Sequence, residues 1–96
     1  MELSFVGELV EWRGPAPFYF VVIPADESDA IAAVATAFTY GWGAIPVRAT
    51  VAQTGFATSL FPRQGRYLLP LKAAVRCPAG IEVGDRVAVE LSLVPA

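Results

Sequence analysis

The stretch IPVRATVAQTGFATSLFPRQGRYLLPL, residues 45–71, constrains the fold most strongly because it alternates apolar segments with short turn-forming segments. At its start, apolar side chains occupy every second position with Arg48 and Thr50 between them, which is the period of a half-buried strand. AQTG (52–55) and PRQG (62–65) contain the glycines and polar residues of turns between antiparallel strands. Three such strands are expected here, at residues 45–51, 56–61 and 66–71.

Residues 81–94, IEVGDRVAVELSLV, carry the clearest alternation in the chain. Gly84 and Asp85 predict a tight turn, and the strand that follows directs Glu90 and Ser92 outward. The side chains expected to point inward are Val87, Val89, Leu91 and Leu93. This pattern is typical of a strand with one face in a core and the other in solvent.

Two more strands are expected near the start of the chain. Residues 2–12, ELSFVGELVEW, place apolar side chains on one face, and Gly7 is expected to mark a bulge. The segment RGPAP (13–17) predicts a turn. Residues 18–23, FYFVVI, are apolar without interruption, which predicts a central strand buried on both of its faces.

Residues 25–38, ADESDAIAAVATAF, predict the one clear helix. Asp26 is the expected N-cap, and an apolar stripe recurs at helical spacing through Ile31, Val34 and Phe38. The acidic residues of the first turn are interpreted as capping residues rather than as metal ligands. The reason is that carboxylates stabilise the positive end of a helix dipole.

Two further signals concern the ends of helices. KAAVR (72–76) predicts one short helical turn, and Pro78 is expected to stop it because proline cannot continue helical hydrogen bonding. Gly41 is expected to end the first helix in the left-handed conformation. The chain therefore predicts a mainly β fold: a small six-stranded antiparallel, partly open barrel with one helix after the second strand. No linker or repeat divides it, so residues 1–96 are expected to form a single domain.

The composition limits the function and the setting of the protein. Apolar residues make up 55% of the chain. This excess indicates either that most strands are buried on both faces or that another subunit covers apolar surface, and of the two a homodimer is favoured. The net charge of −2 argues against nonspecific nucleic-acid binding, which needs many cations to neutralise phosphates. Cys77 is the single cysteine, and MELSFVGELVEW is not a signal peptide, so a cytoplasmic protein is expected. No apolar run has the length of a membrane span.

The order of motifs from residue 59 onward resembles a small bacterial and archaeal family called domain of unknown function 1905. Its pattern runs from a Ser-Leu-x-Pro-like motif through a Gly turn to a Tyr/His-x-Leu-Pro strand, a short helix with an Arg and a Gly-Asp turn. The matching positions are Ser59, Leu60, Pro62, Gly65, Tyr67, Leu69, Pro70, Arg76, Gly84 and Asp85. The resemblance implies a double-split β-barrel similar in shape to AbrB-like regulators, and it implies no activity.

The residue types exclude several kinds of catalysis. The chain contains no histidine, which excludes Ser-His-Asp and Cys-His catalysis and histidine metal sites. GWG (41–43) is not followed by the helix that a phosphate-binding loop requires. Cys77 is interpreted as an ordinary cysteine rather than as a nucleophile. Neither an enzyme activity nor a metal or other cofactor is therefore expected.

The residues that remain for a binding site are aromatic and basic. The candidates are Trp12, Arg13, Tyr40, Trp42, Arg63, Arg66, Tyr67, Lys72 and Arg76. If these residues meet at one mouth of the barrel, they form a concave patch for a small anionic or planar ligand. The alternative interpretation is that the aromatic side chains plug the barrel ends and the cations keep the surface soluble.

Three hypotheses about function follow. The first is a non-catalytic binding module for a small ligand or a protein partner. The second is nucleic-acid binding, which rests on analogy with AbrB-like folds and predicts that the cations of residues 63–76 line one face. The third is a purely structural or interaction domain, which an exposed apolar patch would favour.

Overall fold

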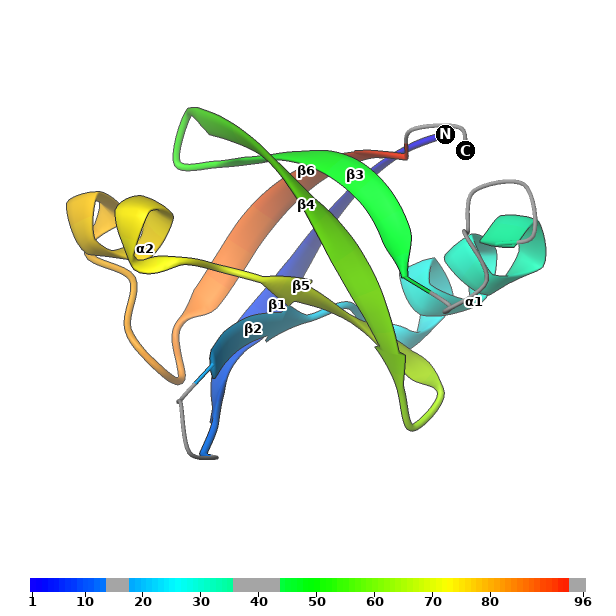
Figure 1. Cartoon of the computed structure of the whole chain (residues 1–96), viewed down its shortest axis with the longest axis horizontal. Helices are drawn as coiled ribbons and strands as arrows, with labels where there is room; N and C mark the ends of the chain where they lie inside the picture. Colours follow the sequence, from blue (N-terminus) through cyan, green and yellow to red (C-terminus); the bar gives the residue numbers. More distant parts are fainter. Residues whose placement is uncertain (14–17, 36–43, 94–96) are drawn as a thin grey trace.

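The computed structural model describes residues 1–13, 18–35 and 44–93, which form six strands and two short helices (Figure 1). The strands are β1 (Glu2–Trp12), β2 (Phe18–Val22), β3 (Ile45–Val51), β4 (Thr54–Arg63), β5 (Arg66–Pro70) and β6 (Arg86–Leu93). The helices are α1 (Ala25–Val34) and α2 (Ala73–Ala79), which lie on opposite sides of the strands. Neither described helix has the length and apolar character needed to cross a membrane.

The strands form a closed barrel in the order β1-β2-β5-β4-β3-β6, and every pair is antiparallel. The predicted six-stranded antiparallel barrel is therefore confirmed, and its ring of pairs is closed rather than partly open. Two long strands connect its two sheets. β1 pairs with β6 along residues 2–8 and with β2 along residues 9–12, and β4 divides in the same way between β3 and β5.

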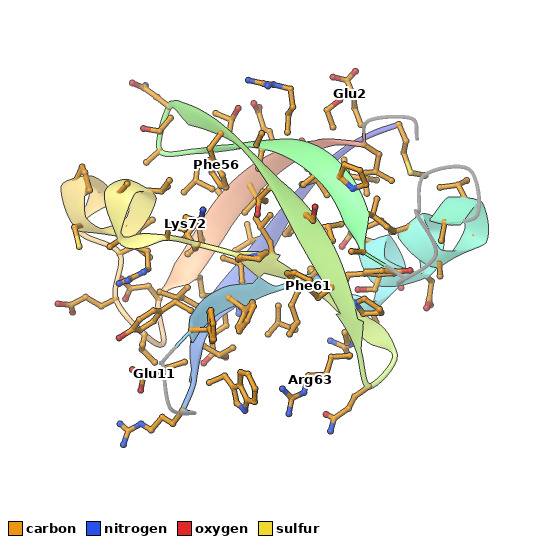
Figure 2. The ribbon with its side chains drawn as sticks, viewed as in Figure 1. Glu2, Glu11, Phe56, Phe61, Arg63 and Lys72 are labelled. Carbon is orange, nitrogen blue, oxygen red and sulfur yellow. The ribbon has the colours of Figure 1, made fainter. Side chains whose placement is uncertain are left out.

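β1 crosses most of the barrel, from Glu2 at the top of Figure 2 to Glu11 near the bottom. The predicted bulge at Gly7 is wrong, because the pairing with β6 continues without a break along residues 2–8. Gly7 instead permits a close approach, since a Cβ at this position would collide with the carbonyl oxygen of Val22. β1 can therefore lie tightly against the end of β2.

The interior of the barrel is filled by side chains from all six strands. The alternation predicted for β3 and β6 is confirmed, since every second side chain of each strand is buried. The other strands contribute Phe5, Leu9, Val21, Leu60, Tyr67 and Leu69. Residues 18–23 are not buried on both faces as predicted, because Phe18 points outward and none of the described elements covers it.

The ends of α1 differ from the prediction. Pro24 takes the N-cap position, and none of the described side chains caps the helix, so Asp26 lies in the first turn. Its carboxylate can still interact favourably with the helix dipole. α1 ends at Val34, while Phe38 and Gly41 lie outside the described residues.

Ser28 attaches α1 to the barrel. Its Oγ donates a hydrogen bond to the carbonyl oxygen of Ile23 (3.0 Å) and accepts one from the backbone N–H of Tyr67 (3.1 Å). Ile31, one turn along the same helix, is buried in the core. These contacts hold α1 against β5 and satisfy polar groups that burial would otherwise leave unpaired.

α2 continues past Pro78, so the prediction that this proline stops the helix is wrong. Proline removes only one backbone donor, and a capping motif at the end of the helix supplies other hydrogen bonds. The backbone N–H of Gly80, whose φ is 67°, donates to the carbonyl oxygen of Cys77 (3.1 Å). The backbone N–H of Ile81 donates to the carbonyl oxygen of Arg76 (3.1 Å). This ending fixes the helix that carries Arg76.

The two hairpin turns are shorter than predicted, with two residues each at 52–53 and 64–65. All four residues have positive φ, between 49° and 78°, which matches the twist of the flanking strands. As a result, β4 is longer than the predicted 56–61 and extends to Arg63. The added residues at its end reach the candidate site.

Candidate functional site

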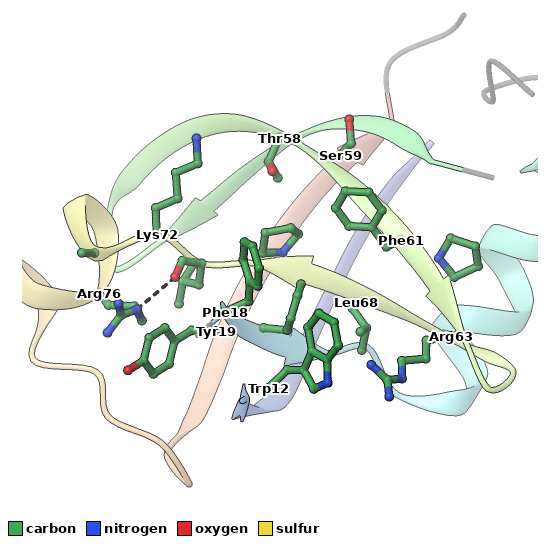
Figure 3. Close-up of a pocket in the computed structure, with 15 residues that line it drawn as sticks. Trp12, Phe18, Tyr19, Thr58, Ser59, Phe61, Arg63, Leu68, Lys72 and Arg76 are labelled. Atoms are coloured by element: carbon green, nitrogen blue, oxygen red, sulfur yellow. Dashed lines mark hydrogen bonds between the residues drawn. The ribbon is translucent and has the colours of Figure 1, made fainter. Parts of the chain in front are cut away.

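A groove of about 770 Å³ lies on the outer face of the sheet formed by β2, β5 and β4, beside α2 (Figure 3). We call it the aromatic groove. Its floor is apolar and consists of Trp12, Phe18, Phe20, Phe61, Leu68 and Pro70. Its rim is polar and consists of Thr58, Ser59, Arg63, Lys72 and Arg76. Pockets of this size and composition are typical of sites for small molecules.

Three aromatic side chains of the floor are about half exposed: 48% for Trp12, 51% for Phe18 and 47% for Phe61. The two-residue period of β2 places Phe18 and Phe20 on its outer face while Val21 enters the core. The ring centroids of Trp12 and Phe18 are 6.2 Å apart, as are those of Phe18 and Phe20. We call these three rings the aromatic row. Its two half-exposed members, Trp12 and Phe18, provide a surface on which a planar molecule can stack, while Phe20 is buried beside them.

Arg63 borders one end of the aromatic row. Its Cζ atom lies 5.4 Å from the centroid of the Trp12 ring, within the range of a cation–π interaction. Figure 3 shows the guanidinium beside the indole. Because Arg63 is exposed, a bound anion can reach its side chain.

Arg76 borders the other end of the groove and is held by two contacts. Its Cζ atom lies 3.7 Å from the centroid of the Tyr19 ring, and its Nε–H donates to the carbonyl oxygen of Leu71 (3.0 Å). The backbone N–H of Arg76 donates to the carbonyl oxygen of Lys72 (3.0 Å), so the two cations are one helical turn apart. A guanidinium fixed in this way loses little further freedom when it binds an anion.

Glu11 forms a hydrogen-bonded group at the edge of the groove. Its carboxylate accepts a hydrogen bond from Nε of Arg13 (2.8 Å). This bond and one from the Tyr19 hydroxyl lower the pKa of Glu11, and the latter raises the pKa of Tyr19. No acidic residue is among the described residues that line the groove. The charged groups of its lining are therefore all positive.

The structure brings together only part of the predicted site. Trp12, Arg63, Lys72 and Arg76 line the aromatic groove. Tyr67 does not, because the period of β5 turns its side chain into the core.

The remaining predicted residues lie elsewhere. Arg13 is directed at Glu11. Arg66 lines a smaller neighbouring hollow. Tyr40 and Trp42 lie outside the described residues.

Sequence reasoning missed most of the groove floor. Phe18 and Phe20 were assigned to a doubly buried strand, and neither Phe61 nor Leu68 was among the predicted site residues. The available signal was parity: in β5, Leu68 lies between the inward residues Tyr67 and Leu69 and must face outward. Strand parity applied to these segments would have placed their aromatic and apolar side chains on one outer face.

The chemistry of the groove is suited to binding. Its hydroxyl groups, on Thr58 and Ser59, have neither a histidine nor a carboxylate beside them among the lining residues described. Cys77 is exposed and lies outside the groove. Residues 1–13, 18–35 and 44–93 contain no group of three or more potential metal ligands. The arrangement offers stacking, cation–π contacts and fixed positive charge.

Comparison with protein families gives a match over nearly the whole chain. A family model described as Domain of unknown function (DUF1905) matches residues 5–91. This match confirms the resemblance inferred from the motifs that begin at residue 59. A comparison with curated proteins finds no match.

Proposed function

Because the chain belongs to the DUF1905 family, whose description specifies no activity, we propose a function from the aromatic groove itself. The protein is a non-catalytic binding module for a small planar anion. The ligand stacks on the aromatic row and directs its charge to the cationic rim. The observation that carries this proposal is that Arg63, Lys72 and Arg76 border a groove with an aromatic floor.

The exposure of the floor supports this proposal. The barrel is held together by its inward side chains, and the half-exposed rings of Trp12, Phe18 and Phe61 add little to that core. Contiguous apolar surface on a small domain is typical of a binding site. A stacked ligand would remove these rings from water and gain hydrophobic free energy without rearranging the barrel.

The test uses anilinonaphthalene sulfonate, an anion whose naphthalene ring offers a planar aromatic surface. In a Trp42→Phe background, fluorescence reports on Trp12, and saturable quenching with one bound probe per chain is expected. Native mass spectrometry of freshly purified protein adds a search for a retained natural ligand. Absence of saturable binding, with no retained ligand, would contradict the proposal.

A double substitution in the groove locates the binding. Phe18→Ser with Phe61→Ser should weaken probe binding by about tenfold or more, since each substitution removes a ring that contacts the bound probe. Val83→Ser is the matched control, because Val83 is also an exposed apolar residue and does not line the groove. Equal loss of binding in both variants would place the probe elsewhere.

A protein partner is the second candidate function, and the same half-exposed rings favour it. A second copy of the chain on this surface would give the homodimer that the apolar composition suggests. Sedimentation velocity distinguishes the two cases. A dimer that dissociates in the Phe18→Ser, Phe61→Ser variant would identify the groove as an interface, whereas a monomer that binds the probe favours the small ligand.

Nucleic-acid binding remains the alternative suggested by AbrB-like folds. Its prediction that four cations line one surface is met in the groove by Arg63, Lys72 and Arg76 but not by Arg66, which lines the neighbouring hollow. Steep weakening of binding with salt would favour this alternative. The lone cysteine is compatible with a cytoplasmic setting for any of these functions.

A further inference from the structure

We propose that the ligand of the aromatic groove is a free mononucleotide. Its base stacks on the aromatic row near Trp12 and Phe18, and its phosphate binds between Lys72 and Arg76. This inference rests on the proposed function and specifies the ligand class of the same site. It follows from the charges at one end of the groove and the rings at the other.

The phosphate assignment rests on the pair of cations beside α2. Lys72 and Arg76 both line this end of the groove (Figure 3), and the backbone hydrogen bond between them (3.0 Å) keeps them one turn apart. The Nε of Arg76 is used by Leu71, which leaves its terminal nitrogens for a bidentate contact. A phosphate monoester carries nearly two negative charges at neutral pH. Two neighbouring cations therefore suit a ligand phosphate better than a ligand carboxylate, which carries only one charge.

The base assignment rests on the shape of the floor. Figure 3 shows Trp12 and Phe61 on two sides of Leu68, so the rings of β1 and β4 flank an apolar strip. A planar base laid on this strip would contact the Trp12–Phe18 pair, and stacking of a base on aromatic side chains is favourable for every base. The hydroxyls of Thr58 and Ser59 on the rim can donate to or accept from a base or sugar.

The charge around the groove favours a free nucleotide over a nucleic-acid strand. A strand would have to continue beyond the cationic rim, whose described cations are Arg63, Lys72 and Arg76. The net charge of the whole chain is −2. A continuous phosphate backbone binds best along an extended cationic surface, which three rim cations do not provide.

Isothermal titration calorimetry compares four probes at one ionic strength: adenosine monophosphate, adenosine, inorganic phosphate and a short single-stranded oligoadenylate. Adenosine monophosphate should bind at least about tenfold more tightly than adenosine, because charge-assisted hydrogen bonds to its phosphate are lost in the nucleoside. It should also bind more tightly than inorganic phosphate, because phosphate cannot stack. The oligoadenylate should bind no more tightly per site than the mononucleotide.

Two variants test the phosphate contacts. Lys72→Gln removes a charge from an exposed side chain, and Arg76→Lys keeps the charge but removes the planar fork. Each should weaken binding of adenosine monophosphate several-fold while leaving the affinity for adenosine unchanged. Arg48→Gln is the matched control, since Arg48 is exposed on β3 and lies outside the groove. Its affinity for both ligands should equal that of the wild type.

Each outcome decides the inference. Equal affinities for adenosine and adenosine monophosphate, or equal losses in Lys72→Gln and Arg48→Gln, would overturn it. Tighter binding of the oligoadenylate with steep salt dependence would overturn it in favour of a strand. Binding of anilinonaphthalene sulfonate without binding of any nucleotide would overturn it and leave the proposed function standing. Failure of every probe, with no ligand retained in native mass spectrometry, would overturn both.

Discussion

The barrel has two outer faces that share one core but carry different side chains. The face of β3, β6 and the first part of β1 is mostly polar and includes Glu2, Ser4, Arg48, Thr50, Glu90 and Ser92. The face of β2, β5 and the end of β4 carries the aromatic groove. Since a barrel needs apolar residues only on its inward positions, the polar face shows what folding alone requires. The aromatic face exceeds that requirement, which is why we assign function to it.

The largest expected effect lies in the core, where the two faces should behave alike. Leu69→Ala in β5 and Leu91→Ala in β6 each remove a buried side chain from the same core. Both should lower the free energy of unfolding by about 2–5 kcal/mol, measured by chemical denaturation. If Leu69→Ala alone left the free energy of unfolding unchanged, the strands of the aromatic face would not share a core with those of the polar face.

A smaller effect is expected where α1 meets the aromatic side of the barrel. Ser28→Ala leaves the buried N–H of Tyr67 without its partner and should cost about 1–3 kcal/mol of unfolding free energy. Amide hydrogen exchange at Tyr67 should become faster. Ser4→Ala, on the exposed polar face, is the control and should change neither quantity. Unchanged exchange at Tyr67 would show that the hydrogen bond does not hold this junction.

Outward substitutions should separate the two faces by function rather than by stability. Phe61→Thr on the aromatic face and Glu90→Thr on the polar face should each change the unfolding free energy by less than about 1.5 kcal/mol, because both side chains are exposed. Only Phe61→Thr should weaken binding of anilinonaphthalene sulfonate. A loss of several kcal/mol in Phe61→Thr would instead show that the ring is structural.

The inward half of the fold could be predicted from sequence because strand parity is a local property. Apolar residues at every second position were enough to place the inward faces of β3 and β6. Strand order could not be predicted, because closure depends on pairing between residues 2–8 and the last strand, at opposite ends of the chain. Phe18, at the start of the apolar run 18–23, was misread as buried, because an apolar residue that faces a groove looks the same in sequence as a buried one.

The candidate site was predicted in part for the same reason. The rim cations Arg63, Lys72 and Arg76 were found because an exposed cation is the default for that residue type. Tyr67 was assigned to the site by its chemistry, but its parity in β5 directs it into the core. Phe18 was missed because no local pattern shows whether a neighbouring element covers a ring. That information exists only in the arrangement of β1, β2 and α2.

The smallest expected effect is the response to acid at the edge of the aromatic groove. Hydrogen bonds from Arg13 and Tyr19 hold the pKa of Glu11 below 4.5, its ordinary value. The folded state therefore favours the charged carboxylate. This stabilisation is complete above pH 4.5 and is lost as the pH falls through the lowered pKa of Glu11 in the folded protein. Carbon-detected NMR titration of the Glu11 carboxyl should show the lowered pKa directly.

A variant connects this titration to stability. Glu11→Gln should slightly lower the thermal midpoint at neutral pH and make its decline below pH 4.5 less steep, because the variant has no carboxylate left to protonate at this position. Glu90→Gln on the polar face controls for the loss of one negative charge. If both variants showed the same acid profile, the Glu11 group would not stabilise the folded barrel. If only Glu11→Gln changed the acid dependence of the thermal midpoint, the hydrogen bonds of Glu11 to Arg13 and Tyr19 would stabilise the folded barrel. Glu90 on the polar face would make no such contribution.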